Sequence, residues 1–431
     1  MAARSAVTTG AVTTDIESGS LKTRETRKAR TSLPLSYWLH SLLGLKVSVL
    51  LAFVSLTGTL ATVAHDLEWL VMPEVRASPY TVGEEDWGAM WAAVQQAMPD
   101  SQVDSVGSYD RADASYFVKK ASVTGPEGNT FNVYVDPGTN TVTGIEHSRS
   151  FQDIMRGLHY YLFTPGDAVF FLIASLGFVL FVTLVTGLIA YKKFWRGLFR
   201  MPRWAQPMRT WMGDIHRLGG LWSVWFVFIM SITSIWYFVE RAGLDFNSQP
   251  PVLSLSPDNP QDSPQDKTEG KYVLTVQDIN TWTELAKQTM PGLHITAVSL
   301  PTRKGQLAAV QGQWRAALVR ERANVVYIDP SSAKVIGTRA AHEMSIGERI
   351  THTADPLHFG NFGGLTSKMI YVVFGLVMTL LSVSGAVIYT KRTKAVLRDG
   401  LTTDAFNYLG AWKWPSLVAV TLVPLIAYVF W

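Results

Sequence analysis

Long apolar runs alternate with polar segments along the chain. Five runs, at about residues 39–64, 168–191, 218–239, 369–390 and 410–431, each hold roughly 20 residues or more with few charges, the length that a helix needs to cross a hydrocarbon layer about 30 Å thick. The first run is longer than the apolar core of a secretory signal peptide, so we expect it to stay in place as an anchor. The pattern predicts an α-helical membrane protein.

Two polar segments between these runs carry a different pattern. In 131–135 (FNVYV) and 324–328 (NVVYI), apolar and polar residues alternate as in half-buried strands, and turn-forming Pro, Gly and Ser residues follow. A helix-like stretch that ends in Met-Pro, at Met98 and at Met290, precedes each alternating stretch. We predict that each segment forms a small α+β domain, with one helix on a short antiparallel sheet.

The two polar segments belong to an internal repeat. Met-Pro precedes Asp-Pro by 38 residues in the first copy and by 39 residues in the second. The similarity extends into the membrane, because the first span opens with HSLLGL from His40 and the third with HRLGGL from His216, while the second and fourth end in Thr-Gly and Ser-Gly. The predicted fold class is therefore an α-helical membrane protein with four core transmembrane helices, a fifth helix without a counterpart, and two α+β domains in a twofold repeat.

Basic residues predict how these parts are oriented. Lys and Arg cluster in the N-terminal tail and in the loops after the second and fourth spans, and such clusters stay on the cytoplasmic side. We expect a bacterial inner-membrane protein with a cytoplasmic N-terminus and periplasmic α+β domains. The formal net charge of +4 is then explained by the orientation of the chain in the membrane and gives no indication of nucleic-acid binding.

The predicted segments follow one another along the chain in this order: a basic tail at 1–36, the first span at 37–65, the first α+β domain at 66–150, the second span at 151–192, a cytoplasmic loop at 193–214, the third span at 215–240, a linker at 241–270, the second α+β domain at 271–345, an outer loop with the fourth span at 346–392, a cytoplasmic loop at 393–408 and the fifth span at 409–431.

Four of the nine histidines occupy equivalent positions in the repeat: His40 and His216 at the inner ends of spans, His159 and His358 at the outer ends. The chain has no cysteine, so any redox cofactor must be held by His, Met or other ligands. A single histidine at such a place is most simply a helix-end residue near lipid headgroups. The fourfold recurrence favours a shared role, because ionisable groups at the membrane are costly unless they are paired or functional.

Neutral imidazole is a good iron ligand, and haem iron can take one imidazole from each of two helices. We predict that His40 and His216 hold one haem b near the inner face and that His159 and His358 hold a second near the outer face. The two haems would form an electron path across the membrane. Gly44 and Gly220 follow the inner histidines by one turn, where a side chain would obstruct a flat macrocycle. Close packing of helices is the alternative reason for these glycines.

The other histidines have less defined roles. His65 ends the first span on the outer side, and His352 precedes His358 by six residues. Either could replace an outer ligand, the two could form a third metal site, or both could make ordinary hydrogen bonds. We expect His147, His294 and His342, in the α+β domains, to be surface residues.

Four pieces of the chain carry a family resemblance. They are HSLLGLK from His40 with Thr57-Gly58, the pair Leu158-His159, DIHRLGGLW from Asp214, and LHFGNFGG from Leu357. Over roughly residues 36–392 the chain resembles the PepSY-associated transmembrane helix family and its branch of inner-membrane ferric siderophore reductases. The resemblance implies two PepSY-like domains, two haems b with bis-histidine ligation, and reduction of a periplasmic ferric siderophore with release of Fe(II). The fifth span and His65 depart from the usual pattern.

No dinucleotide, flavin or phosphate-binding motif is found in the sequence. We therefore expect electrons from a separate cytoplasmic protein or from quinol in the bilayer, and no catalytic residues beyond the haem ligands. Two alternatives remain: another periplasmic electron acceptor, or a non-enzymatic membrane protein whose PepSY-like domains bind or modulate partners.

Overall fold

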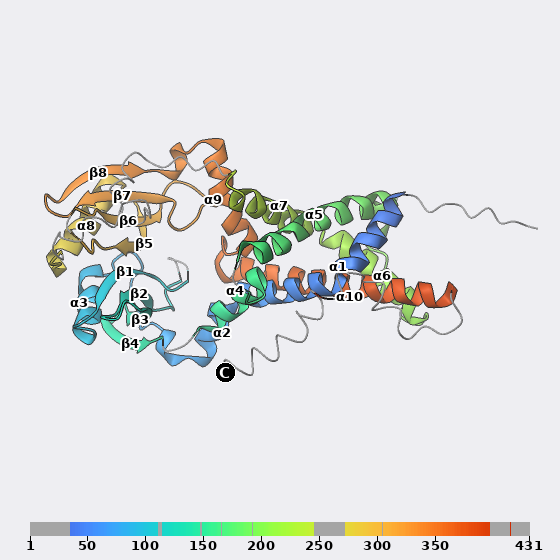
Figure 1. The fold of residues 1–431 in the computed structure, drawn as a ribbon, viewed down its shortest axis with the longest axis horizontal. Helices are drawn as coiled ribbons and strands as arrows, with labels where there is room; N and C mark the ends of the chain where they lie inside the picture. Colours follow the sequence, from blue (N-terminus) through green and yellow to red (C-terminus); the bar gives the residue numbers. More distant parts are fainter. Residues whose placement is uncertain are drawn as a thin grey trace, which may run out of the picture.

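A bundle of long helices carries, at one end, a region built on β-strands (Figure 1). The computed structural model describes residues 35–110, 114–146, 149–164, 166–191, 193–244, 272–303, 305–396 and 414. The predicted fifth span, apart from Trp414, lies outside the described residues, as do nearly all of the predicted tail and linker.

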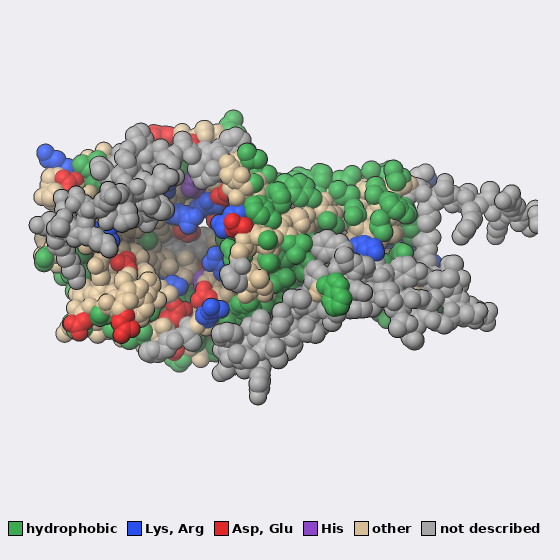
Figure 2. All heavy atoms as spheres, viewed as in Figure 1, with side chains coloured by type: hydrophobic (Ala, Val, Ile, Leu, Met, Phe, Trp, Pro, Cys, Tyr) green, Lys and Arg blue, Asp and Glu red, His purple; other side chains and the backbone are tan. Residues whose placement is uncertain are grey.

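Four of the described helices are long and apolar enough to cross a membrane. They are α1 (Leu35–Thr62), α5 (Asp167–Ala190), α7 (Val224–Arg241) and α10 (Gly364–Val396). Hydrophobic side chains cover the visible surface of this bundle, whereas charged side chains concentrate around the strands (Figure 2). The predicted four core membrane helices are confirmed, and the chain is a membrane protein.

Small residues allow the helices of the bundle to approach closely. α1 packs along α10 and α5, and α5 packs along α7. A Cβ added to Gly177 of α5 would come within 2.7 Å of the Ser234 Cβ on α7, and one added to Gly375 of α10 would collide with Thr59 of α1. Glycine, serine and threonine at such contacts are typical of helix packing in membranes, where close van der Waals contact replaces the hydrophobic effect.

The third predicted span is divided in the structure. α6 (Met208–Trp222) ends at Ser223, and α7 begins directly after it. Ser223 has φ −94° and ψ 7°, and its hydroxyl donates to the carbonyl of Gly219 at 2.7 Å. Glycine and serine weaken a helix locally, which explains the break. His216 therefore lies on α6, and the membrane-length segment is α7.

Short helices connect the bundle to the strands. α2 (Ala64–Val71) continues from α1, α4 (Phe151–Tyr161) precedes α5, and α9 (Ile346–Phe359) precedes α10. Ser150 and Ser345 begin α4 and α9 with capping boxes, in which the serine side chain and an acidic side chain three residues later each accept a backbone N–H. Of the described 3₁₀ turns, Pro73–Val75 and Ala341–Glu343 lie in these connections, and Phe194–Gly197 lies between α5 and α6.

The strands form one antiparallel sheet of eight, in the order β4-β3-β2-β1-β5-β6-β7-β8. The first segment supplies α3 (Trp87–Ala97), β1 (Gln102–Ser108), β2 (Lys119–Thr124), β3 (Thr130–Asp136) and β4 (Thr141–Ile145). The second supplies α8 (Val276–Thr289), β5 (His294–Ser299), β6 (Ala308–Gln313), β7 (Asn324–Asp329) and β8 (Lys334–Arg339). One helix followed by four antiparallel strands recurs in both, which confirms the predicted α+β region.

The two segments share a sheet and a hydrophobic core. β1 and β5 pair antiparallel, with Val106 opposite Val298, so that neither remains an exposed edge strand. α3 packs against α8, and Trp87 and Trp282 are each 1% exposed within a single core cluster. The alternating pattern predicted the strands, but it did not indicate that the two sheets would join.

Candidate functional site

The structure brings His40 of α1 close to His216 of α6, at the end of the bundle away from the sheet. Their ring centroids are 6.2 Å apart, and the ring planes make an angle of 79°. Two imidazoles that bind one metal ion through ring nitrogens, at about 2.0–2.1 Å each, have ring centroids about 6 Å apart. The spacing is thus suited to a metal ion shared between the two rings.

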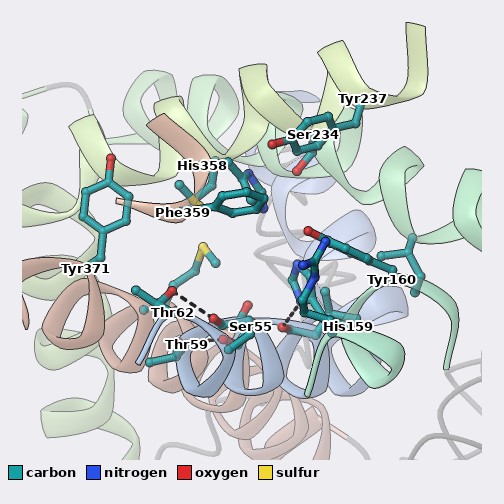
Figure 3. Close-up of a pocket in the computed structure, with 18 of the residues that line it drawn as sticks. Ser55, Thr59, Thr62, His159, Tyr160, Ser234, Tyr237, His358, Phe359 and Tyr371 are labelled. Carbon is teal, nitrogen blue, oxygen red and sulfur yellow. Dashed lines mark hydrogen bonds between the residues drawn. The ribbon is translucent and has the colours of Figure 1, made fainter. Parts of the chain in front are cut away.

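His159 and His358 form a second pair at the sheet end of the bundle. His159 comes from α4 and His358 from α9, and both side chains enter the same pocket (Figure 3). Their ring centroids are 6.1 Å apart at an interplanar angle of 48°. The repeat predicted these residues at the outer ends of spans, whereas each lies on a separate short helix that precedes the span.

In the first half of the chain, backbone carbonyls hold the histidines. Nδ1 of His40 lies 2.8 Å from the carbonyl oxygen of Thr183 on α5, and Nδ1 of His159 lies 2.9 Å from that of Val54 on α1. A carbonyl oxygen can only accept, so Nδ1 must carry the hydrogen. In the neutral ring, Nε2 then keeps its lone pair and can bind a metal.

In the second half of the chain, side-chain hydroxyl groups hold the histidines. Nδ1 of His216 lies 2.9 Å from Oγ of Ser384 on α10, and Nδ1 of His358 lies 2.8 Å from Oγ1 of Thr233 on α7. Each hydroxyl already donates to a carbonyl in the preceding turn of its own helix, at 3.1 Å and 2.8 Å respectively. It therefore accepts from the imidazole. All four rings have the same tautomer, fixed from a neighbouring helix, which is the usual support of a metal-binding histidine.

Glycines on the supporting helices make room for three of the rings. A Cβ added at Gly58, Gly187 or Gly385 would approach an imidazole Cε1 to 2.6, 3.1 and 3.4 Å, and the rings concerned are those of His159, His40 and His216. Gly58 and Gly187 lie four residues after Val54 and Thr183, whose carbonyls accept from the histidines. Gly385 directly follows Ser384, whose hydroxyl accepts from His216. In the fourth case, Ser234 follows Thr233. The recurring Thr-Gly and Ser-Gly pairs are thus the places where a span receives a histidine.

Gly44 and Gly220 face open space. A Cβ added at either position would meet no protein atom within 4 Å. Close helix packing therefore does not explain these two glycines within the described part of the chain. Space beside both inner histidines is what a flat macrocycle between them would need.

A cavity surrounds the outer histidine pair. Apolar side chains from the bundle form its inner walls, among them Leu176, Leu180, Phe226, Met230 and Met378. Polar side chains line it toward the sheet: His65, Asp110, Gln152, Arg156, Asn361 and Lys368. Figure 3 shows His159 and His358 on facing walls, with Tyr237 and Ser234 beyond them. An apolar chamber with a polar mouth is suited to a large, mostly apolar group that carries charged substituents.

A family model described as the PepSY-associated TM region matches residues 37–392. The chain belongs to this family. Among curated proteins, none matches it. The predicted membership of the PepSY-associated transmembrane family is thus confirmed, and the match covers all four histidines of the two pairs. The reductase branch stays a prediction.

In this PepSY-associated chain, a cluster of charges lines the cavity toward the sheet. Nζ of Lys368 on α10 lies 2.8 Å from Oδ2 of Asp66 on α2 and 2.5 Å from Oδ2 of Asp110, which follows β1. Nδ1 of His65 lies 3.1 Å from Oδ1 of Asp110. The Lys368 side chain is only 4% exposed. The cluster joins the bundle to the first half of the sheet.

A second set of contacts joins His358 to the other half of the sheet. Nη2 of Arg320, between β6 and β7, donates to Glu240 at the end of α7 and to Asp355 of α9, in each case at 3.1 Å. The Tyr237 hydroxyl donates to Asp355 at 3.0 Å, and its ring lies 5.1 Å from that of His358. The position of α9, and with it His358, is thus tied to the sheet.

The remaining histidines are not brought to the two pairs. Among the described residues, neither His65 nor His352 makes a ring contact with another histidine, and no cluster of three or more His, Asp or Glu side chains could hold a metal ion. His352 is 6% exposed, and its burial and the charge of Arg339 lower its pKa to about 4. His294 lies on β5, His342 lies 3.6 Å from Glu343, and His147 is outside the described residues.

Sequence reasoning missed most of the residues that support the site. Thr183 and Val54 act through backbone carbonyls, which leave no signal in the side-chain pattern. Asp66, Asp110 and Lys368 lie far apart in the chain and meet only in the folded protein. The Thr-Gly and Ser-Gly repeats were visible, but their contact with the histidines was not.

Proposed function

We propose that the chain is a transmembrane dihaem b oxidoreductase that passes electrons outward to a ferric siderophore in the periplasm and releases Fe(II). The observation that carries the proposal is the orientation of four imidazoles. Each has its Nδ1–H bound to a neighbouring helix and its Nε2 lone pair unused by that bond. They form two pairs with centroid separations of 6.1 and 6.2 Å.

The residues present fit haem b as the cofactor. His40 with His216 would hold the inner haem, and His159 with His358 the outer one. A haem held by two neutral imidazoles would suit one-electron transfer, because its iron would keep no coordination position free for oxygen or substrate. A haem b supplies reversible one-electron chemistry at its iron when bound. The protein orients the imidazoles, provides apolar walls and keeps Gly44 and Gly220 without side chains.

The separation of the two pairs along the α1 axis supports an electron path across the membrane. His40 and Val54, whose carbonyl holds His159, are fourteen residues apart on α1, which corresponds to about 21 Å along the helix axis. Lys and Arg cluster in the tail and in the loops at the inner-pair end of the bundle. By the positive-inside rule, this end faces the cytoplasm and the sheet faces the periplasm of a bacterial inner membrane. Electrons would enter near His40 from a cytoplasmic protein or quinol.

A ferric siderophore is the acceptor that the family resemblance favours. Oxygen donors bind Fe(III) more tightly than Fe(II), so transfer of one electron weakens the complex and releases the metal while the chelator stays intact. The cavity mouth beside the outer pair, with Arg156, Gln152 and Asn361, lies on the side of the bundle where this acceptor would arrive.

The first test is a dithionite-reduced minus oxidised visible spectrum of detergent-purified protein, with a pyridine haemochrome count. We expect about two b haems per chain with sharp low-spin bands. Reduction of a ferric siderophore, trapped with a ferrous-specific chelator, then tests the acceptor. If another periplasmic acceptor oxidises the reduced protein and ferric siderophores do not, the substrate assignment is wrong. No haem after expression with ample haem supply would contradict the proposal and favour a non-enzymatic, partner-binding protein.

A further inference from the structure

His65 and Asp110 form a hydrogen-bonded pair on the wall of the outer cavity. The Nδ1 to Oδ1 distance is 3.1 Å, and both side chains are 12% exposed. Both residues line the cavity that contains His159 and His358. The ring neighbours of His65 are Tyr109 at 4.8 Å and Phe117 at 6.4 Å. His65 is therefore a titratable group inside the outer cavity that belongs to neither imidazole pair.

The tautomer of His65 follows from its partner. Burial opposes a charge on Asp110, but the hydrogen bond from His65 and the nearby charge of Lys368 outweigh it and hold the pKa of Asp110 well below its usual range. An ionised carboxylate only accepts, so Nδ1 of His65 carries a hydrogen. Nε2 is then the atom that can gain a proton from water.

The charges around His65 balance only when it is protonated. The charged and titratable groups around His65 come from every element packed against it: Asp66 and Glu68 on α2, Asp110 and Tyr109 after β1, Tyr116 before β2, Lys120 on β2, Glu146 after β4, Arg156 on α4 and Lys368 on α10. The tyrosines are neutral here because each donates its hydroxyl to a carboxylate, Tyr109 to Glu68 and Tyr116 to Asp66. Of these described groups, the carboxylates outnumber the cations by one. A proton on His65 removes that excess negative charge from a poorly solvated place.

We propose that His65 is a proton-binding site coupled to the outer histidine pair. This inference rests on the proposed function. A haem held by His159 and His358 would accept one electron from the inner centre, and one proton from periplasmic water would then bind Nε2 of His65. When the electron passes to the ferric chelate, the proton returns to water. The net charge of the cavity is thus the same before and after each transfer. The low polarity of the cavity makes the added electron and the proton stabilise one another.

A spectroelectrochemical titration between about pH 5 and about pH 9, the range in which histidine titrates, tests the coupling. The outer potential is identified as the one that is absent from the His358→Ala variant. In the wild type we expect it to fall as pH rises, by up to about 59 mV for each tenfold change in proton concentration when one proton accompanies one electron. In His65→Gln the slope should disappear, and the outer potential at acidic pH should fall below that of the wild type. The inner potential should not respond to the substitution.

Two further variants keep the test decisive. Asp110→Asn removes the charge that stabilises a proton on His65 and should also flatten the slope. His342→Gln changes an imidazole in the 3₁₀ turn after β8, which does not line the cavity, and should leave both potentials unchanged. If the wild type has two haems but a pH-independent outer potential, or if the slope survives in His65→Gln, this inference is wrong and the proposed function stands. If no haem binds, both fall.

Discussion

The inner and outer histidine pairs have nearly the same spacing but are built differently. His40 lies on the membrane-length helix α1, whereas His216, His159 and His358 lie on the shorter helices α6, α4 and α9. Within each pair, one ring is held by a backbone carbonyl and the other by a hydroxyl. The support of the ring, rather than the type of helix that carries it, is the property that both pairs share.

The surroundings of the two pairs differ more than the pairs themselves. The outer pair lies below the Lys368 cluster and beside the Arg320 contacts, so it is connected to both halves of the sheet. Among the described residues, the partners of the inner pair come from the bundle helices α5 and α10. We infer that changes in the sheet region affect the outer centre and leave the inner centre unaffected.

The largest expected effect comes from removal of a ligand. His159→Ala or His358→Ala should reduce the haem count from two to one, with the outer haem lost and the inner haem retained. His40→Ala or His216→Ala should remove the inner haem instead. Pyridine haemochrome assays and redox titration of each variant distinguish the two centres. Full haem content in all four variants would show that the ligand assignment is wrong.

A substitution beside the ring should have nearly as large an effect. In Gly58→Ala the new Cβ would lie 2.6 Å from Cε1 of His159, so the ring must move and the outer haem should be lost. Gly213→Ala is the matched control, because Gly213 is also on a helix and the same methyl group meets no neighbouring atom within 4 Å there. Gly44→Phe should fill the open space beside the inner histidines and exclude the inner haem. The haem content and the thermal unfolding temperature of the three variants should be compared. If Gly58→Ala keeps its outer haem, the proposed geometry of the outer site is wrong.

Loss of the buried cation should destabilise the outer half of the molecule. Lys368→Met removes the cation between Asp66 and Asp110, and removal of one member of a buried ion pair typically costs about 3–5 kcal/mol. Arg241→Gln breaks a pair with Asp167 whose side chains are 50% and 62% exposed, and it should cost less than about 1 kcal/mol. Denaturant unfolding in detergent, followed by tryptophan fluorescence, compares the two. Equal stability of both variants would contradict a structural role of the cluster.

The smallest expected effect is a loss of support for one ring. Thr233→Val removes the acceptor for His358 and keeps the shape of the side chain, whereas Ser384→Ala removes the acceptor for His216. Loss of such a partner typically weakens binding of the metal by about 10- to 100-fold. Haem transfer to an excess of apomyoglobin should be faster from the outer site in Thr233→Val and from the inner site in Ser384→Ala. Equal rates in both variants and the wild type would show that these hydroxyls do not support a ligand.

The sequence predicted the parts of the molecule that depend on local periodicity. Apolar runs indicated the four described spans, alternation indicated the strands, and the repeat brought His40 to His216 and His159 to His358 as expected pairs. The role of these pairs as haem ligands stays a prediction. The sequence did not predict that the third span breaks at Ser223. The glycines that precede Ser223 explain the break once the structure shows that α6 ends there.

Other features depend on contacts between distant residues. The joining of two sheets through Val106 and Val298 requires two apolar strands to meet, and the periodicity of each strand is the same whether or not they do. In the sequence, Lys368 is a single cation beside an apolar run. Its structural role depends on the carboxylates of Asp110 and Asp66, which lie about 260 and 300 residues away along the chain. Propensity and periodicity act over a few turns, so they cannot report such contacts.

The central β1–β5 pairing also imposes an order of assembly. β5 is synthesised about 190 residues after β1, and the chain must cross the bundle twice in the interval. During translation, the edge of β1 that later pairs with β5 therefore remains unpaired. An unpaired strand edge can form incorrect β-pairings with other segments or other chains. His216 is synthesised before β5, whereas His358 follows the last strand. His40 and His216 can consequently come together on a nascent chain whose sheet is still open, but Ser384, which supports His216, is made only after the last strand. The outer histidines can meet only after the second half of the sheet has been made.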